Sequence, residues 1–242
     1  MILPTIRASF SRRDVLHLVQ LLGRGDDELR RGAELRLDEE GADAILDDPR
    51  VLNTLLTDPD ASAPTDLVFY VLVRHALLEV GIDDRATADY VASLVVAFGS
   101  QGRAYRPSDA TPEEYHYLVD MVARLASADQ REAFLLRSHL GNYSLWLSGL
   151  FPDYLAARVH RRGAPDLRYY ERMGVTGYHL ASRSPEAKSL GVDRILHDVG
   201  EHFSGVRTAL NLVSDRYLWP HAGDPVGRLL REVTIRPGDD AS

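Results

Sequence analysis

The sequence predicts an all-α protein, a multi-helix bundle around a buried central helix at about residues 130–151. Residues 138–152 contain no Asp, Glu, Lys or Arg, although charged residues make up 26% of the chain. A helix that is apolar or small on every side is normally buried at the centre of a bundle. Elsewhere, apolar residues recur at helical spacing and few segments alternate as β-strands do.

The central segment has two distinct faces when it is drawn as a helix. One face carries large side chains: His139, Tyr143, Trp146 and Leu150. Another carries small ones: Gly141, Ser144 and Ser148. Because small residues let two backbones approach closely, the second face predicts a tightly packed neighbouring helix. The uncharged stretch is shorter than the roughly 20 residues that cross a bilayer, so no transmembrane segment is expected.

A regular apolar seam near the C-terminal end predicts one continuous helix over residues 192–217. Its members are separated by alternating steps of four and three residues: Val192, Leu196, Val199, Phe203, Val206, Leu210, Val213 and Tyr217. Such a seam packs against the rest of a bundle or pairs two copies of a chain. A homodimer is therefore one expectation for this protein.

Helix-start signals separate the predicted helices. Thr111-Pro112-Glu113-Glu114 combines a capping threonine, a proline in the first turn and a glutamate three residues on, so it predicts a helix that begins there. Ser127 with Gln130 repeats the pattern before the central helix, and Asp166 is suited to cap a later one. Pro152 is expected to end or kink the central helix.

Acidic residues gather near the N-terminus. Residues 26–60 hold twelve acidic residues and four arginines, a net charge of −8, which equals the charge of the whole chain. Proline and small polar residues at 58–64 are typical of a linker. We therefore expect an acidic helical N-terminal subdomain (residues 1–60), a main helical bundle (65–220) and a C-terminal tail (221–242).

Composition excludes several classes of protein. The chain has no cysteine, so disulfides, thiolate metal sites and cysteine nucleophiles are absent. A net charge of −8 makes nucleic-acid binding an unlikely function, because phosphate contacts need a basic surface. The first residues lack the pattern of a secretory signal, so a cytoplasmic location is expected. No complete phosphate-binding loop, dinucleotide fingerprint or serine-hydrolase elbow occurs.

Polar and aromatic residues in two predicted helices form the candidate ligand-binding set. Its members are Arg137, His139, Asn142, Tyr143 and Trp146 on the central helix, and Tyr169, Tyr170 and Glu171 on a later one. Buried polar groups must find partners, so these residues either form a core network or bind a small planar or anionic ligand. His139 is also suited to acid–base chemistry or to axial haem ligation.

A local excess of positive charge gives the candidate anion-binding set. Residues 158–172 hold five arginines and only two acidic residues. The arginines are Arg158, Arg161, Arg162, Arg168 and Arg172. They could bind a phosphate or carboxylate ligand, an anionic membrane surface or the chain's own acidic segment. The ordinary alternative is a solvated basic face.

No metal site is predicted from the spacing of potential ligands. Glu113 and His116 form half of a di-iron motif, whose second half is missing. His197 and His202 lie about 140° apart around a helix and cannot easily share one metal ion. His197 with Glu201 is therefore interpreted as a surface pair, as is Asp198 with His202.

Another histidine, His75, follows an arginine inside an apolar helix. Arg74 must reach solvent or a carboxylate there, and Glu79 lies one turn beyond His75, so a structural pairing is expected rather than a catalytic one.

Together these patterns favour a cytoplasmic all-helical binding or interaction protein, a regulatory or scaffold component that binds a protein partner or a second copy of itself. The alternative is a helical-bundle enzyme or sensor with a buried small-molecule, haem or metal site around His139, Asn142 and Tyr143. The sequence does not decide whether the chain is an enzyme or which cofactor it uses.

Overall fold

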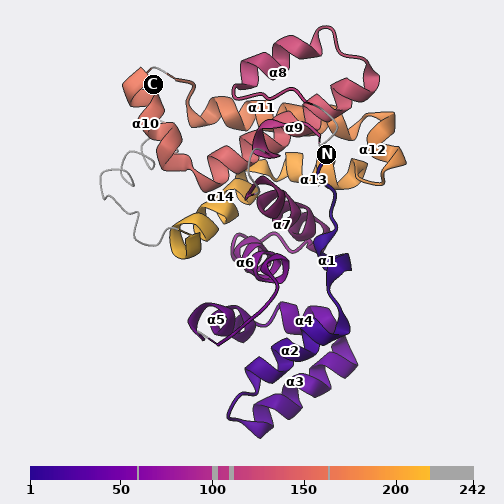
Figure 1. The fold of residues 1–242 in the computed structure, drawn as a ribbon, viewed down its shortest axis with the longest axis vertical. Coiled ribbons are helices and arrows are strands. Elements are labelled where there is room, and N and C mark those ends of the chain that lie inside the picture. Colours follow the sequence, from indigo (N-terminus) through magenta and orange to yellow (C-terminus); the bar gives the residue numbers. More distant parts are fainter. Residues whose placement is uncertain (59, 100–102, 109–111, 163, 219–242) are drawn as a thin grey trace, which may run out of the picture. The chain divides into compact units, whose positions relative to one another are not determined.

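The computed structural model describes residues 1–58, 60–99, 103–108, 112–162 and 164–218 (Figure 1). These residues form fourteen α-helices, one short 3₁₀-helix and one π-helical turn, with no strand among them. The predicted all-α class is confirmed. None of the helices in these ranges has both the length and the apolar character needed to cross a membrane.

Backbone contacts divide the chain into two compact units. The first comprises Pro4–Val96, and the second comprises Met1–Leu3 with the chain from Ala97 onward. The first unit includes the predicted linker at 58–64 and the helix that follows it. An acidic subdomain limited to residues 1–60 therefore stays a prediction, and the predicted tail at 221–242 lies outside the described residues.

The first unit consists of short helices followed by two longer ones. They are α1 (Ile6–Ser9), α2 (Arg12–Leu22), α3 (Asp27–Glu40), α4 (Ala42–Leu46), α5 (Pro49–Thr57), α6 (Thr65–Glu79) and most of α7 (Arg85–Gly99). Helix α2 packs against α3, α4 and α5, and α6 packs against α1 and α5. Ser11 and Asp14 form a capping box at the start of α2, and Asp26 caps α3.

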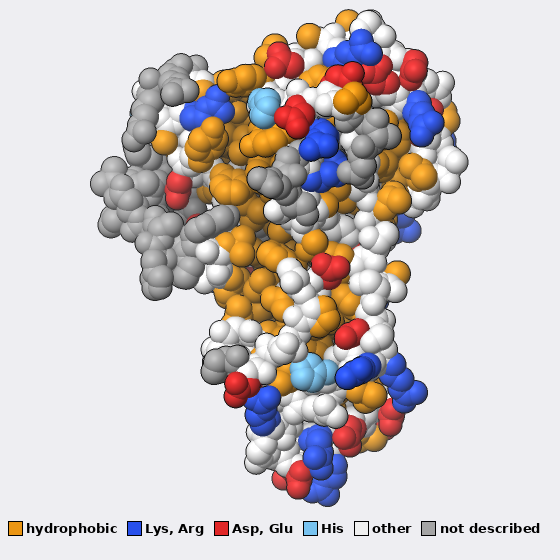
Figure 2. Space-filling model, in the orientation of Figure 1, with side chains coloured by type: hydrophobic (Ala, Val, Ile, Leu, Met, Phe, Trp, Pro, Cys, Tyr) orange, Lys and Arg blue, Asp and Glu red, His pale blue; other side chains and the backbone are white. Residues whose placement is uncertain are grey.

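Acidic and basic side chains alternate on the first unit, as Figure 2 shows around α2 and α3. In α3, Arg30 pairs with Asp27 and Glu34. Arg36 reaches Asp48, whose side chain is 3% exposed. The acidic segment is therefore partly neutralised by its own arginines.

Arg74 is 1% exposed and donates hydrogen bonds to Asp47 at 2.8 and 2.9 Å. It also pairs with Asp83, and His75 forms a 3.0 Å hydrogen bond with the backbone carbonyl of Leu46. Arg74 thus meets carboxylates, as expected for a buried arginine, and the absence of a catalytic role stays a prediction.

The second unit is organised around the predicted central helix. Its described elements are η1 (Arg103–Tyr105), α8 (Leu118–Leu125), α9 (Gln130–Leu150), α10 (Pro152–Arg162), α11 (Leu167–Ser182), α12 (Pro185–Ser189), α13 (Asp193–Glu201), α14 (Phe203–Val213) and η2 (Ser214–Leu218). Helix α9 contacts α8, α10, α11, α12 and α14. Pro152 ends α9 and begins α10, as expected.

The small face of α9 receives α11 and α14. A Cβ atom added at Gly141 would lie 2.7 Å from the Tyr178 ring, and one at Gly149 would lie 2.7 Å from Leu210. Asn211 of α14 donates to the backbone carbonyls of Ser148 and Gly149. The predicted close helix packing is confirmed.

The helix start predicted at Thr111–Glu114 is wrong for the residues that can be compared. Residues 112–115 are not helical, α8 begins only at Leu118, and Thr111 lies outside the described residues. The amide of Tyr115 donates to the carbonyl of Tyr105 at 2.7 Å, and the Tyr115 side chain is buried. The backbone at Tyr115 therefore bonds to a distant segment and does not form the first turn of a helix capped by Thr111.

The continuous helix predicted over 192–217 is also wrong, because the chain turns at His202 between α13 and α14. The turn lets α13 pack on α11 and α14 pack on α9. Every member of the apolar seam except Tyr217 is nonetheless buried. The seam residues therefore pack inside the second unit and do not form an exposed surface for a second copy. Self-association stays a prediction, and the seam no longer supports it.

Candidate functional site

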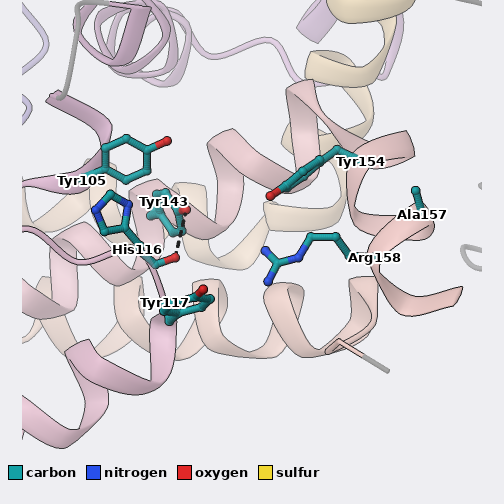
Figure 3. A pocket seen from close by; sticks show the side chains of 7 residues that line it. All are labelled: Tyr105, His116, Tyr117, Tyr143, Tyr154, Ala157 and Arg158. Carbon is teal, nitrogen blue, oxygen red and sulfur yellow. Dashed lines mark hydrogen bonds between the residues drawn. The ribbon is translucent and has the colours of Figure 1, made fainter. Parts of the chain in front are cut away.

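A pocket of about 450 Å³ opens in the second unit and is lined mainly by aromatic side chains (Figure 3). Its lining residues are Tyr105, His116, Tyr117, Tyr143, Tyr154, Ala157 and Arg158. Small-molecule sites typically occupy roughly 300–1,000 Å³. The pocket therefore has room for a compact organic ligand.

Four elements supply these side chains: η1, the segment before α8, and helices α9 and α10. Tyr105 ends η1, and His116 lies in the segment before α8. The hydrogen bond between the Tyr115 amide and the Tyr105 carbonyl holds these two segments together. The rings of Tyr105 and His116 consequently lie 4.3 Å apart, between centroids. Helices α9 and α10 form the remaining wall.

Arg158 is the positively charged group of the pocket. Its guanidinium carbon lies 5.9 Å from the centre of the Tyr117 ring and 5.5 Å from that of Tyr154. Figure 3 shows this side chain extending from α10 into the space between the tyrosines. No carboxylate within the described ranges forms a salt bridge with it. Arg158 thus lies against aromatic rings, and no hydrogen bond of its guanidinium is found among the described residues.

Tyr143 forms the inner end of the pocket. It is 6% exposed, and burial raises the pKa of its hydroxyl well above the usual value. The hydroxyl donates a 3.4 Å hydrogen bond to the backbone carbonyl of His116. Its ring stacks 6.0 Å from that of Trp146. Tyr143 therefore stays neutral, and its one hydroxyl proton is directed at the His116 carbonyl.

His139 lies one turn before Tyr143, in the core. It is 2% exposed, and its ring contacts Phe98 at 5.6 Å and Tyr143 at 6.2 Å. Burial lowers its pKa to about 3, an effect to which Arg103 adds. The ring hydrogen-bonds to the backbone of Ala104, whereas Nε2 has no hydrogen-bond partner. The imidazole is therefore neutral at physiological pH.

The other members of the candidate ligand set lie apart from the pocket. Asn142 accepts a 2.9 Å hydrogen bond from the Tyr178 hydroxyl, which matches the core-network interpretation. Arg137 is half-buried on α9, and its backbone oxygen meets α11 at Gly177. Glu171 interacts electrostatically with the buried Arg207.

Tyr170 comes nearest to the pocket among the candidates on α11. It is 6% exposed, and burial raises its pKa, while the charge of Arg158 acts in the opposite direction. Tyr169 packs edge-on against it at 5.8 Å. Thus Tyr143 and Arg158, one residue from each candidate set, meet in the same pocket, with Tyr170 close by.

The candidate anion-binding arginines do not share one environment. Arg158 lines the pocket, whereas Arg168 and Arg172 are exposed on α11. The side chains of Arg161 and Arg162 lie outside the described part of the molecule.

The sequence did not identify four aromatic residues as part of a binding site: Tyr105, His116, Tyr117 and Tyr154. Three of them are among the eleven tyrosines of the sequence, and the four share no spacing pattern. Nothing in their spacing showed that the segments before α8 fold over α9.

Comparisons with protein-family models, with curated proteins and with solved structures find no match to this chain.

Proposed function

We propose that this chain is a small-molecule-binding protein whose ligand is a planar organic anion, such as an aromatic carboxylate or an aryl phosphate. The observation that carries the proposal is Arg158, a guanidinium that lines a tyrosine-rich pocket and forms no salt bridge within the described residues. Guanidinium groups pair with carboxylate and phosphate through two parallel hydrogen bonds.

The tyrosines suit the other half of such a ligand. Their rings offer flat apolar surfaces for stacking, and a tyrosine hydroxyl that is not already bonded can donate to an oxyanion. Tyr117 is 56% exposed and Tyr154 is 53% exposed, so the outer wall is open to solvent. The inner wall at Tyr143 is buried, which gives the pocket a dry end for a ring.

Calorimetric titration with three matched probes tests the proposal: benzoate, phenyl phosphate and neutral benzamide. The charged probes should bind more tightly than benzamide. Arg158→Gln should weaken binding of the charged probes about tenfold or more, since hydrogen bonds to charged groups contribute about 1.5–3 kcal/mol. The same change should leave the affinity for benzamide nearly unaltered.

Arg168→Gln is the matched control, because Arg168 is exposed on α11 outside the pocket. It should preserve binding of all three probes. Equal losses in the two variants would mean that general charge attracts the probes, not a site at Arg158. Failure of both charged probes to bind better than benzamide would also overturn the proposal.

A protein-interaction function is the second candidate. Three exposed aromatic or aliphatic side chains near the start of α8 favour it: Tyr117, Val119 and Val122, which are 56%, 62% and 41% exposed. Exposed apolar residues on one helix are typical of partner surfaces when they are contiguous. If no probe binds, this interpretation as a regulatory or scaffold component becomes the leading one.

A further inference from the structure

Two histidines and a glutamate from neighbouring helices meet on the second unit, away from the residues that line the tyrosine pocket. His179 lies in the last turn of α11, and His197 and Glu201 lie one turn apart on α13. The potential ligand atoms of these three side chains all lie within 4.8 Å of one another. We propose that His179, His197 and Glu201 form a binding site for a divalent transition-metal ion, with Zn²⁺ as the expected ion.

The distances are close to those that zinc requires. Zinc–nitrogen and zinc–oxygen bonds of about 2.0–2.2 Å in a tetrahedral arrangement place the ligand atoms about 3.4 Å apart. Nε2 of His179 and Oε1 of Glu201 are already 3.4 Å apart. The rings of His179 and His197 lie 5.5 Å apart, between centroids. A small rotation of the exposed His197 side chain would bring all three donors into range.

Close helix packing holds His179 beside α13. A Cβ atom added at Gly200 would lie 3.4 Å from two atoms of the His179 ring and 3.3 Å from Tyr178. The imidazole of His179 therefore lies close to the backbone of α13 at Gly200. The side chain of His179 is only 21% exposed, so its position is restricted before any ion binds.

Two histidines and one glutamate are ligands that suit Zn²⁺, an ion of borderline softness. Imidazole nitrogens with one carboxylate are characteristic of zinc and related transition metals, whereas magnesium and calcium prefer oxygen ligands alone. His197 and Glu201 share a helix face because they are four residues apart. Three protein ligands leave the fourth tetrahedral position to water at the surface. A bound ion would join α11 to α13.

The alternative is a simple surface pair between His179 and Glu201. The sequence pointed to His197 with Glu201, but Glu201 pairs with His179 instead. Asp198 pairs with Arg194, and the ring of His202 hydrogen-bonds to the Asp198 backbone carbonyl. His202 is thus occupied elsewhere, which makes it a useful control.

The experiment uses the intact chain of 242 residues, stripped with a chelator and desalted. Equilibrium dialysis against Zn²⁺ should give one bound equivalent, measured by elemental mass spectrometry. His197→Ala and Glu201→Gln should each weaken Zn²⁺ binding at least tenfold, and His202→Ala should retain it. Zn²⁺ should also raise the thermal unfolding midpoint of the wild-type chain and of His202→Ala, because an ion that binds only the folded state stabilises it.

Cobalt provides a second, spectroscopic readout that reports on the ligands of the ion. Co²⁺ in a site of nitrogen and oxygen ligands should produce a visible absorption band in the wild-type protein and none in His197→Ala. Circular dichroism checks that each variant is folded, which is expected because the substituted side chains are exposed. Binding below half an equivalent, or equal binding by wild type, His197→Ala and Glu201→Gln, would overturn the site.

Discussion

His139 couples the stability of the protein to pH through its burial in the core of the second unit. An unfolded histidine has a pKa of about 6.5, whereas burial lowers the pKa of His139 to about 3. Below pH 6.5 the unfolded chain therefore takes up a proton that the folded chain does not. Stability should fall as the pH drops from about 6.5 towards 3 and should be unaffected by this group above that range.

His139→Phe should remove this dependence. Between pH 7 and pH 5 the wild-type free energy of unfolding should fall by about 2 kcal/mol through His139 alone. The variant should show a flatter profile in urea unfolding, although not a flat one, because burial also lowers the pKa of His75. Phe134→Leu is the control: Phe134 is 2% exposed on the same helix, so the variant should lose stability and keep the wild-type slope. Identical slopes for wild type and His139→Phe would contradict the argument.

The packing of α9 against α11 depends on glycines that cannot carry a side chain. A Cβ atom at Gly177 would lie 2.7 Å from the backbone oxygen of Arg137 and 2.8 Å from the backbone nitrogen of Gly141. Backbone atoms cannot rotate away as a side chain can. Gly177→Ala should therefore force the two helices apart and lower the free energy of unfolding by about 1–3 kcal/mol, measured by urea titration.

Gly32→Ala is the matched control for this prediction. Gly32 lies exposed inside α3, and an added Cβ would meet no atom within 4 Å. Alanine is a better helix former than glycine, so this variant should gain about 0.5–1 kcal/mol. Opposite signs for the two substitutions would show that close approach of the helices, not helix propensity, decides the effect at Gly177. A gain in stability for Gly177→Ala would refute the packing argument.

The helix ends show which local signals survive folding. Asp166 caps α11 as predicted, accepting a 2.9 Å hydrogen bond from the Tyr169 amide. At the head of α9 the cap is Asp129 and not Ser127, although the helix begins near the predicted residue. No helix begins at the cap pattern Thr111–Glu114, because the Tyr115 amide donates its hydrogen bond to the Tyr105 carbonyl. Sequence spacing therefore predicts helix existence better than helix ends.

Across the whole chain, the sequence predicted the helical class and the central helix because both depend on local periodicity. The uncharged run of α9 that begins at Ser138, and the small face with Gly141, follow from burial against neighbours, which any helix in that position would need. The tyrosine pocket and the cluster at His179 could not be predicted in the same way. Each depends on segments that are distant in sequence and meet only after the helices pack.

The division into two units can be tested at a single peptide bond. Lys188 is the one lysine in the sequence, and it is exposed on α12 in the second unit. A lysine-specific protease can therefore attack the chain at one internal position, and the rate of cleavage there follows the opening of that unit. The rate should rise in Gly177→Ala, because that substitution destabilises the packing of α9 and α11.

Asp48→Asn supplies the contrasting change in the first unit. The carboxylate of Asp48 pairs with Arg36 and Arg50, and these contacts lower its pKa to about 2. Its charge therefore stabilises the fold above about pH 4, and the gain is lost as the pH falls through 2. At pH 7 the variant should destabilise the first unit by about 1–3 kcal/mol, seen as faster hydrogen exchange in α3 and α5.

Cleavage at Lys188 in the Asp48→Asn variant should stay at the wild-type rate if the two units unfold separately. Equal acceleration by Asp48→Asn and Gly177→Ala would instead show that the chain unfolds as one cooperative whole.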